Sequence, residues 1–389
     1  MPNKSPSQFV SELLEKLAGT SRHVAFLLGA GTSKAIGLPD VPELGKRVGE
    51  GIASRDKALG ETYDKILGER KNIEGALSWI RSIASVLHGS TASNFQGIDA
   101  ETSATLNKEI CGQIARIVSQ DPSEGFQVHR SFAGWLGRSE HRLPVEVFTL
   151  NYDLLVERGL ELAGVPYFDG FAGVFEGRFR TDLVDSAESG ATGRLEVPPG
   201  WVRVWKLHGS ISWRIKYPQG TSGGNAYISR VGSPLPPESD QEMLAIYPSE
   251  EKYQESRRLP FTTLFDRFRR SLAVSESLTI ISGYSFLDQD VNEIIFDAVE
   301  RFPRSEVVAL FFSDVPELVV DRAKNSPNLS VAGAKLAVLS GQTREWQPEE
   351  IDRCFWKGGE FRLGDFRCLV ETLVGGREPS EPGTTTDAS

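Results

Sequence analysis

The feature that constrains the fold most is a run of five apolar residues, Val24 to Leu28, that ends directly at a Gly-Ala-Gly-Thr-Ser turn. An apolar run of this length, bounded by glycine, is typical of a strand that is buried on both faces. Four later stretches have the same character, at residues 144–150, 202–207, 277–282 and 306–312. Helical patterns follow the first, third and fourth of them. Apolar strands that alternate with helices predict an α/β fold with a doubly wound parallel sheet.

A large helical block interrupts this alternation. Apolar residues recur at helical spacing in three stripes, which begin at Leu44, Ile73 and Leu106. Two glycine-rich loops, at 169–200 and 217–240, are long enough to form a lid. We therefore divide the chain into a sheet domain, a helical insertion, a C-terminal segment and a polar tail that we expect to be disordered. Their residues are 1–42 with 138–330, 43–137, 331–375 and 376–389.

Composition excludes several classes of function. A formal net charge of -10 argues against a nucleic-acid-binding surface, and we expect the basic run 266–271 to be a solvated helix face. No apolar run approaches the roughly 18 residues of a membrane span, and the N-terminus lacks the apolar region of a signal peptide. We therefore expect a cytoplasmic protein without membrane contact. Three scattered cysteines predict neither a disulfide framework nor a zinc site, so we expect no metal.

Polar clusters follow the predicted strands, at the sheet edge where α/β proteins bind ligands. The glycine turn would let the backbone approach a phosphate, and Thr32 would add a hydroxyl donor, although such a turn is often only a tight corner. Asn151 is placed to orient a ligand, whereas Asp153 is equally well interpreted as the N-cap of the next helix. His208, beside the small Gly209, suits general base chemistry, although a single histidine is more often structural.

Five short segments in this order, "GAGTS", "GLPD", "TLNYD", "KLHGS" and "GYSF", resemble the Rossmann-like NAD-binding domain of sirtuins, in the branch found in prokaryotic antiviral defence proteins. The resemblance runs from about residue 23 to 315. It implies contacts between the NAD pyrophosphate with its adjoining ribose and four residues of the first segment, Gly29, Ala30, Gly31 and Ser33. It places Pro39 and Asp40 on the nicotinamide side, Asn151 and Asp153 in the nicotinamide pocket, His208 as the catalytic histidine, and Gly283 and Ser285 at the adenosine end.

The sequence also departs from the protein deacetylases of that family. The family's Phe-Arg pair does not follow Asp40, and the four cysteines of the family's zinc ribbon are missing. With no acyl acceptor, water is the simplest nucleophile, so we expect hydrolysis of NAD to nicotinamide and ADP-ribose. The resemblance further implies an antiphage effector that depletes NAD in an abortive infection, as a homo-oligomer or with a HerA-type hexameric ATPase. The alternatives are a module that senses NAD or ADP-ribose, a protein deacylase without zinc, and a nuclease, for which no clustered carboxylates stand at metal-binding spacing.

Overall fold

The computed structural model of the chain describes residues 3–88, 93–119, 126–173, 176–186, 200–216, 227–232, 243–246 and 260–375, together with Pro198. The tail that we expect to be disordered, 376–389, lies outside the described residues, as does much of the two long loops. None of the helices in the described ranges is long and apolar enough to span a membrane.

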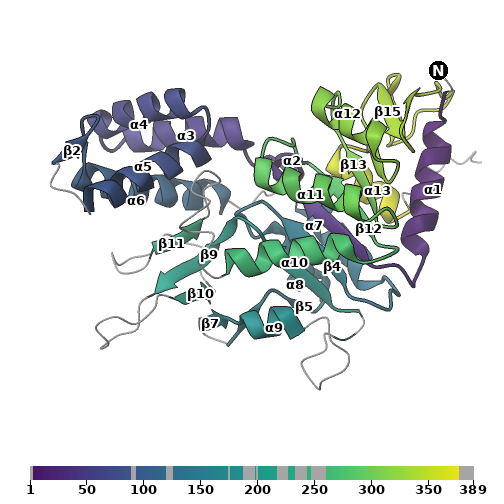
Figure 1. Ribbon diagram of the computed structural model, residues 1–389, viewed down its shortest axis with the longest axis horizontal. Coiled ribbons are helices and arrows are strands. Elements are labelled where there is room, and N and C mark those ends of the chain that lie inside the picture. Colours follow the sequence, from purple (N-terminus) through teal and green to yellow (C-terminus); the bar gives the residue numbers. More distant parts are fainter. Residues whose placement is uncertain are drawn as a thin grey trace, which may run out of the picture.

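Nine strands of the described chain form one large sheet (Figure 1). Their order is β16-β15-β14-β13-β12-β1-β4-β8-β5, and the strands from β14 to β5 run parallel. Antiparallel β15 and β16 extend one edge. The strands are β1 (Val24–Leu28), β4 (Val145–Thr149), β5 (Tyr167–Phe168), β8 (Val202–Lys206), β12 (Leu278–Ser282), β13 (Glu306–Leu310), β14 (Leu329–Ala332), β15 (Leu336–Leu339) and β16 (Gln342–Glu345).

This topology confirms the predicted doubly wound parallel sheet. All five predicted strands are present, with ends within one or two residues of those expected. The sequence did not indicate β14, β15 and β16. These strands show that part of the C-terminal segment 331–375 continues the large sheet. The segment then forms a short hairpin and a helix, β17 (Trp356–Lys357), β18 (Glu360–Phe361) and α13 (Phe366–Leu373).

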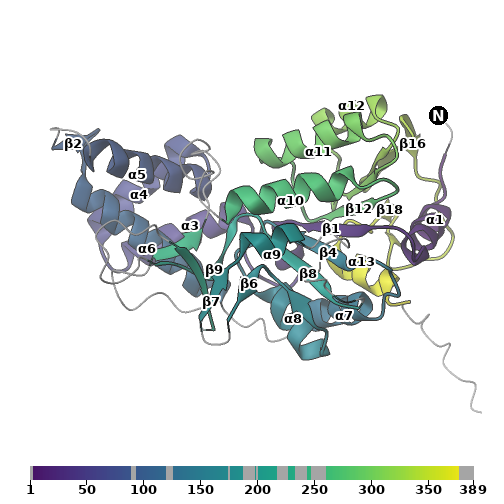
Figure 2. The same ribbon diagram turned by 60° about the horizontal axis from the view of Figure 1, so that its bottom comes forward.

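Helices cover both faces of the sheet, because each central strand is apolar on both sides. In β1, Val24, Phe26 and Leu28 pack in one hydrophobic cluster, and Ala25 and Leu27 pack in another. The first cluster includes residues of α1 (Pro6–Ala18), α7 (Gln127–Gly137), α8 (Leu155–Ala163) and α13. The second includes residues of α10 (Phe261–Ala273), α11 (Gln289–Arg301) and α12 (Glu317–Asn325). Figure 2 shows these two layers on either side of the strands.

The helical block forms a separate layer at one end of the molecule (Figure 1). It consists of α3 (Val41–Ala53), α4 (Lys57–Arg70), α5 (Ile73–His88) and α6 (Ala100–Val118), with a short hairpin of β2 (Asn94–Phe95) and β3 (Ile98–Asp99). Its core is a third cluster, which contains all the apolar stripes expected from the sequence. Helix α7 lies within the expected range 43–137, but Phe132, Ala133 and Leu136 of this helix pack against the large sheet.

A second, antiparallel sheet is formed by strands that both precede and follow β8 in the chain. It has the order β11-β9-β10-β7-β6, within the described residues, and was not anticipated from the sequence. Its strands are β6 (Phe171–Ala172), β7 (Glu176–Phe179), β9 (Gly209–Lys216), β10 (Tyr227–Val231) and β11 (Met243–Ile246); the remaining helices are α2 (Ala30–Lys34) and α9 (Thr181–Ser186). Since β8 ends at Lys206 and β9 begins at Gly209, His208 stands where the chain passes from one sheet to the other.

A buried charge cluster stabilises the amino half of the large sheet. Glu146 of β4 is fully buried, and its carboxylate accepts hydrogen bonds from Arg267 of α10 and from Trp205 Nε1 at 2.7 Å. His23 Nε2 lies 3.0 Å from the same carboxylate. Arg267 belongs to the basic run 266–271, so the expectation of a solvated helix face is wrong for this residue. Burial opposes ionisation of Glu146, but Arg267 outweighs it and holds the pKa of the carboxyl well below its usual range.

Candidate active site

The loops that follow β1, β4, β8 and β12 meet at the carboxyl edge of the parallel strands. Backbone hydrogen bonds link neighbouring loops: Leu150 N donates to Leu28 O at 3.0 Å, and Leu207 N donates to Thr149 O at 2.9 Å. Strand β1 lies between β4, to which the chain proceeds next, and β12, to which it returns later. This is the point where the strand order reverses, and open α/β sheets bind their ligands in the crevice beside it.

Glycine allows the loops after β1 and β12 to pack backbone against backbone. A Cβ atom on Gly29 would lie 2.4 Å from the carbonyl oxygen of Gly283, and one on Gly31 would lie 2.7 Å from Gly283 Cα. Gly283 itself has a φ of +68°, and its Cβ would lie 2.5 Å from Thr32 N. Side chains at these three positions would force the loops apart. The structure thus brings together the first and last of the predicted segments.

Most polar groups of the glycine loop have partners inside the protein. Gly29 N donates to Ser282 O at 3.0 Å, Gly31 N to Gly283 O at 2.9 Å, and Thr32 N to Gly29 O at 3.0 Å. The Thr32 hydroxyl, which is buried, donates to Gly29 O at 2.8 Å. Ala30 and Gly31 are the half-buried residues of this segment, so a ligand can reach them more easily than the buried Gly29, Thr32 and Ser33.

Asn151 joins the loop after β4 to the glycine loop. Its Nδ2 atom lies 3.1 Å from Gly29 O, 3.1 Å from Thr32 Oγ1 and 2.9 Å from Ser33 Oγ, so its two N–H groups are shared among three acceptors. Its own N–H group donates to Thr149 Oγ1 at 3.1 Å. The side chain is half-buried and rigidly held at the sheet edge. Two groups that the sequence placed on separate strands are therefore in direct contact.

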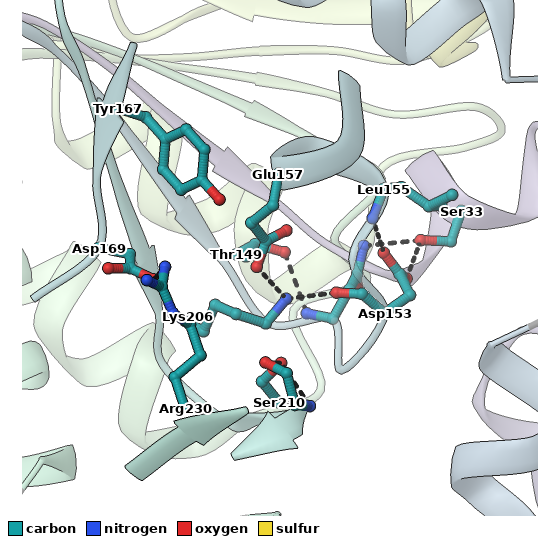
Figure 3. A network of polar contacts seen from close by, with 12 residues as sticks. Ser33, Thr149, Asp153, Leu155, Glu157, Tyr167, Asp169, Lys206, Ser210 and Arg230 are labelled. Carbon is teal, nitrogen blue, oxygen red and sulfur yellow. Dashed lines mark hydrogen bonds and ion pairs between the residues drawn. The ribbon is translucent and has the colours of Figure 1, made fainter. Parts of the chain in front are cut away.

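Asp153 bonds both to the glycine segment and to the start of the next helix, although the N-cap residue of α8 is Leu154. Its Oδ2 atom accepts from Ser33 Oγ at 2.6 Å, and its Oδ1 atom accepts from Leu155 N at 3.1 Å, at the start of α8 (Figure 3). The carboxylate is only 5% exposed. It therefore fixes the orientation of α2 relative to α8, and through Ser33 it supports Asn151.

A buried lysine, Lys206, links Asp153 to Glu157. The Lys206 ammonium donates to the backbone carbonyl of Asp153, and it lies 3.2 Å from Glu157 Oε1 (Figure 3). Burial raises the pKa of Glu157, and the opposing charge of Lys206 does not cancel this effect. Lys206, the lysine of the "KLHGS" segment, thus holds the turn after β4 in place. The sequence did not indicate this contact.

His208 lies between two carboxylates and is 3% exposed. Its Nε2 atom is 3.1 Å from Asp288 Oδ2, and its Nδ1 atom is 3.7 Å from Glu74 Oε1. Burial alone lowers the pKa of a histidine, but the contact with Asp288 and the charge of Glu74 outweigh it, so the pKa of His208 is raised. The pKa of Asp288 is lowered, since the contact with His208 outweighs its burial.

Neither of these two carboxylates was predicted from the sequence to be a site residue. Asp288 is the N-cap of α11 and accepts hydrogen bonds from Asp290 N at 2.8 Å and Val291 N at 3.2 Å. An aspartate before a helical pattern indicates this cap, but not the contact of its other oxygen with His208. Glu74 belongs to the helical block, where an acidic residue in the first turn of α5 is unremarkable.

Three other predicted residues, Pro39, Asp40 and Ser285, differ in burial and in their contacts. Asp40 is the N-cap of α3: its Oδ1 accepts from Glu43 N at 3.1 Å, and its Oδ2 accepts from Lys34 Nζ at 2.6 Å. The residue before it, Pro39, is buried, and Ser285 is exposed to solvent. The described residues contain no group of three or more His, Cys, Asp or Glu side chains that could hold a metal ion.

Residues 145–332 match the family model of the SIR2-like domain. The matched range runs from β4 to β14, and β1 with its glycine loop lies before it.

Two solved structures are similar at low identity. One, of a Sir2 homologue in complex with NAD, is 15% identical over 82% of this chain and 87% of that chain, with a TM-score of 0.37. Another, which concerns the structural basis for sirtuin substrate affinity, is 13% identical over 95% and 99% of the two chains, with a TM-score of 0.40. No protein of curated function matches the chain.

Proposed function

We propose that this chain, whose residues 145–332 match the SIR2-like domain, binds NAD at the carboxyl edge of its large sheet and hydrolyses the bond between nicotinamide and ribose. One observation carries the proposal. The Asn151 amide is hydrogen-bonded to the glycine loop, and the next loop along this edge carries His208. An amide that could position a ligand and a titratable imidazole thus share the sheet edge with a glycine segment that starts a helix, an arrangement that suits a phosphate.

In the proposed binding mode, different segments of the chain contact the pyrophosphate, the adenosine end and the nicotinamide end of NAD. The segment Gly29–Ser33, which is the N-cap and first turn of α2, receives the pyrophosphate, chiefly at the half-buried Ala30 and Gly31. Gly283 and the exposed Ser285 lie at the adenosine end. Pro39 and Asp40 lie on the nicotinamide side, where the ion pair with Lys34 ties Asp40 to the last residue of α2.

The proposed reaction needs a positioned water and one proton acceptor. The bond between C1′ and the nicotinamide nitrogen breaks, its electron pair leaves with neutral nicotinamide, and the water oxygen bonds to C1′. The water gives up one proton in this step, and His208 accepts it before releasing it to solvent. Asn151 orients the ribose hydroxyls or the water, and the negative charge of Asp153 favours the developing positive charge on the ribose.

We further propose that the activity serves antiphage defence by depleting NAD. Free hydrolysis of NAD would kill the host cell, so such an enzyme needs control by assembly into a homo-oligomer or by a partner such as a HerA-type hexameric ATPase. The helical block and the segment 331–375 are the surfaces on which we would look for those contacts. Nicotinamide release that depends on added ATPase would support a partner, whereas release by the purified chain at every concentration would contradict this form of control.

The reaction itself is tested by incubating the full chain with NAD and quantifying nicotinamide by chromatography. Asn151→Ala and His208→Ala should each reduce turnover about a hundredfold or more, the usual loss when one positioned catalytic group is removed. Asn325→Ala, which changes an exposed residue of α12, is the matched control and should keep full turnover.

Three outcomes would separate the proposal from its alternatives. NAD binding by calorimetry without any nicotinamide release would indicate a sensing module. Release that requires an acyl-lysine peptide, and that yields the deacylated peptide, would indicate a deacylase. Undiminished turnover in both Asn151→Ala and His208→Ala would remove the proposed mechanism.

A further inference from the structure

The surroundings of His208 do not suit a proton acceptor as they stand. An imidazole can remove a proton only through an unprotonated ring nitrogen. Here Nε2 faces Asp288 at 3.1 Å and Nδ1 faces Glu74 at 3.7 Å. Asp290 adds a third negative charge nearby. Carboxylates on both nitrogens favour the doubly protonated imidazolium, which has no lone pair left to accept a proton.

The two carboxylates are held very differently. Asp288 is anchored by the backbone N–H groups of Asp290 and Val291, on the same loop that packs against the glycine turn. Glu74 lies on α5, in a helical block whose core is separate from the two clusters of the large sheet. Its contact with His208 is also the longer one. If one carboxylate withdraws, it is Glu74, and Asp288 remains to orient the ring.

The helical block reaches His208 through the first turn of α5, which carries Glu74. Asn72 Oδ1 accepts from Gly75 N at 2.7 Å, which caps the start of α5 and directs its first turn. Tyr152, between Asn151 and Asp153, donates from its hydroxyl to Glu74 Oε1 at 3.1 Å. Both Tyr152 and Ile211, on the strand after His208, pack in the hydrophobic cluster of the helical block. A displacement of the block would therefore move Glu74 relative to His208.

We propose that Glu74 is an inhibitory residue. While the helical block is docked, Glu74 prevents His208 from acting as a base, and withdrawal of Glu74 activates the enzyme. The proposal rests on the function proposed above and names how that same site is regulated. In the docked state the Glu74 carboxylate faces Nδ1 at 3.7 Å and its charge favours a proton there. When a second copy or a partner pulls the block away, Nδ1 becomes free to accept a proton, and Asp288 keeps Nε2 in place. The Arg81 side chain of α5, whose charge acts on Tyr152, moves with the block.

Two substitutions of Glu74 test this proposal in the full chain. Glu74→Gln removes the charge, and Glu74→Ala removes the contact. A facing carboxylate typically moves a pKa by about one to three units, so either change should raise the neutral fraction of His208 about tenfold or more at a pH below its pKa. We expect nicotinamide release by the isolated chain to rise by a similar factor. Glu61→Gln, which removes an exposed carboxylate of α4 from the same block, is the matched control and should change nothing.

A second measurement reports on the histidine itself. Histidine-selective labelling and NMR titration, with His208→Gln used to assign the resonance, should show a lower pKa of His208 in both Glu74 variants than in the wild type. Asp288→Asn removes the other carboxylate, but it also removes the group that orients the ring. It should therefore lower the pKa of His208 and reduce nicotinamide release. A role for Glu74 in folding alone would leave the His208 titration of folded protein unchanged.

The possible results divide clearly. A lower pKa together with faster release in the Glu74 variants supports the proposal. An unchanged pKa overturns it, and so does a lower pKa with equal or slower release in variants whose circular dichroism matches the wild type. If no variant releases nicotinamide while NAD still binds, the hydrolase function fails, and the inhibitory role falls with it. If the wild type releases nicotinamide and the Glu74 variants release no more, only the inhibitory role fails.

Discussion

The close packing of the two glycine loops makes a quantitative prediction for Gly283→Ala. Gly283 has a φ of +68°, and a Cβ there would lie 2.5 Å from Thr32 N and 2.9 Å from the Gly31 carbonyl carbon. Both are backbone atoms, which cannot rotate away as a side-chain tip can. The loops must separate, and the hydrogen bond from Gly31 N to Gly283 O at 2.9 Å is lost with them.

The expected magnitude is the sum of three effects. The left-handed backbone conformation costs alanine about 1 kcal/mol. Overlap in a packed region costs about 1–3 kcal/mol more, and the lost hydrogen bond adds about 1 kcal/mol. Gly164→Ala isolates the first effect, because Gly164 has nearly the same φ, +67°, and nothing lies within 4 Å of a Cβ built there. We expect Gly283→Ala to be about 2–4 kcal/mol more destabilising than Gly164→Ala.

Urea unfolding, followed by tryptophan fluorescence, measures this difference. The buried Trp205 and Trp213 report on the large and small sheets that lie beside the site. A calorimetric titration with NAD completes the test, since Gly283→Ala should weaken NAD binding and Gly164→Ala should not. Equal unfolding free energies for the two variants would refute the reasoning, because they share everything except the close backbone contact.

Three further predictions concern polar groups. Ser33→Ala removes the hydroxyl that donates to Asp153 at 2.6 Å, so it should cost about 1–3 kcal/mol in urea unfolding; an unchanged midpoint would show that the bond contributes nothing. Glu146→Gln leaves Arg267 buried without its carboxylate and should destabilise the fold by about 3–5 kcal/mol. The pKa of Glu146 is lower in the folded than in the unfolded protein. Its contribution to the free energy of unfolding is therefore present above the unfolded pKa and is lost as the pH falls through the folded pKa. In thermal melts, Glu146→Gln should lose less stability on acidification than the wild type. Nicotinamide release should increase as the pH rises through the raised pKa of His208, which places the acid limb above the ordinary histidine value; a rate independent of pH there would argue against His208 as the base.

The sequence predicted the parallel sheet well because the signals are local. Each of the five expected strands is a short apolar run that ends at glycine or a polar cluster, and burial on both faces leaves a recognisable pattern. The candidate residues of these strand ends also converge, since parallel strands carry their carboxyl ends to one edge. The contact between Asn151 and the glycine loop follows from this topology.

The small sheet and the partners of His208 could not be predicted in the same way. Strands β6 and β7 lie within residues 169–200 and β10 lies within residues 217–240, so the expectation of loops is wrong for these parts. These glycine-rich stretches show no clean alternation of polar and apolar residues that would have indicated strands. Glu74 reaches His208 from an insertion far away in the sequence, and nothing in its neighbourhood along the chain distinguishes it from an ordinary first-turn acid. Arg267 shows the same limit, because its charge suggested solvent and its partner Glu146 sits inside a strand.

The Glu146 cluster has a practical consequence for engineering. Glu146 and Thr149 lie three residues apart on β4, which corresponds to roughly 10 Å of extended chain. One end of this strand therefore holds a buried charge cluster, and the other end leads to the residues proposed to act on NAD. An engineer who wants a more heat-tolerant version can redesign the amino end of the sheet and leave the binding edge untouched. Directed evolution for a new nucleotide should concentrate its mutations at the opposite end.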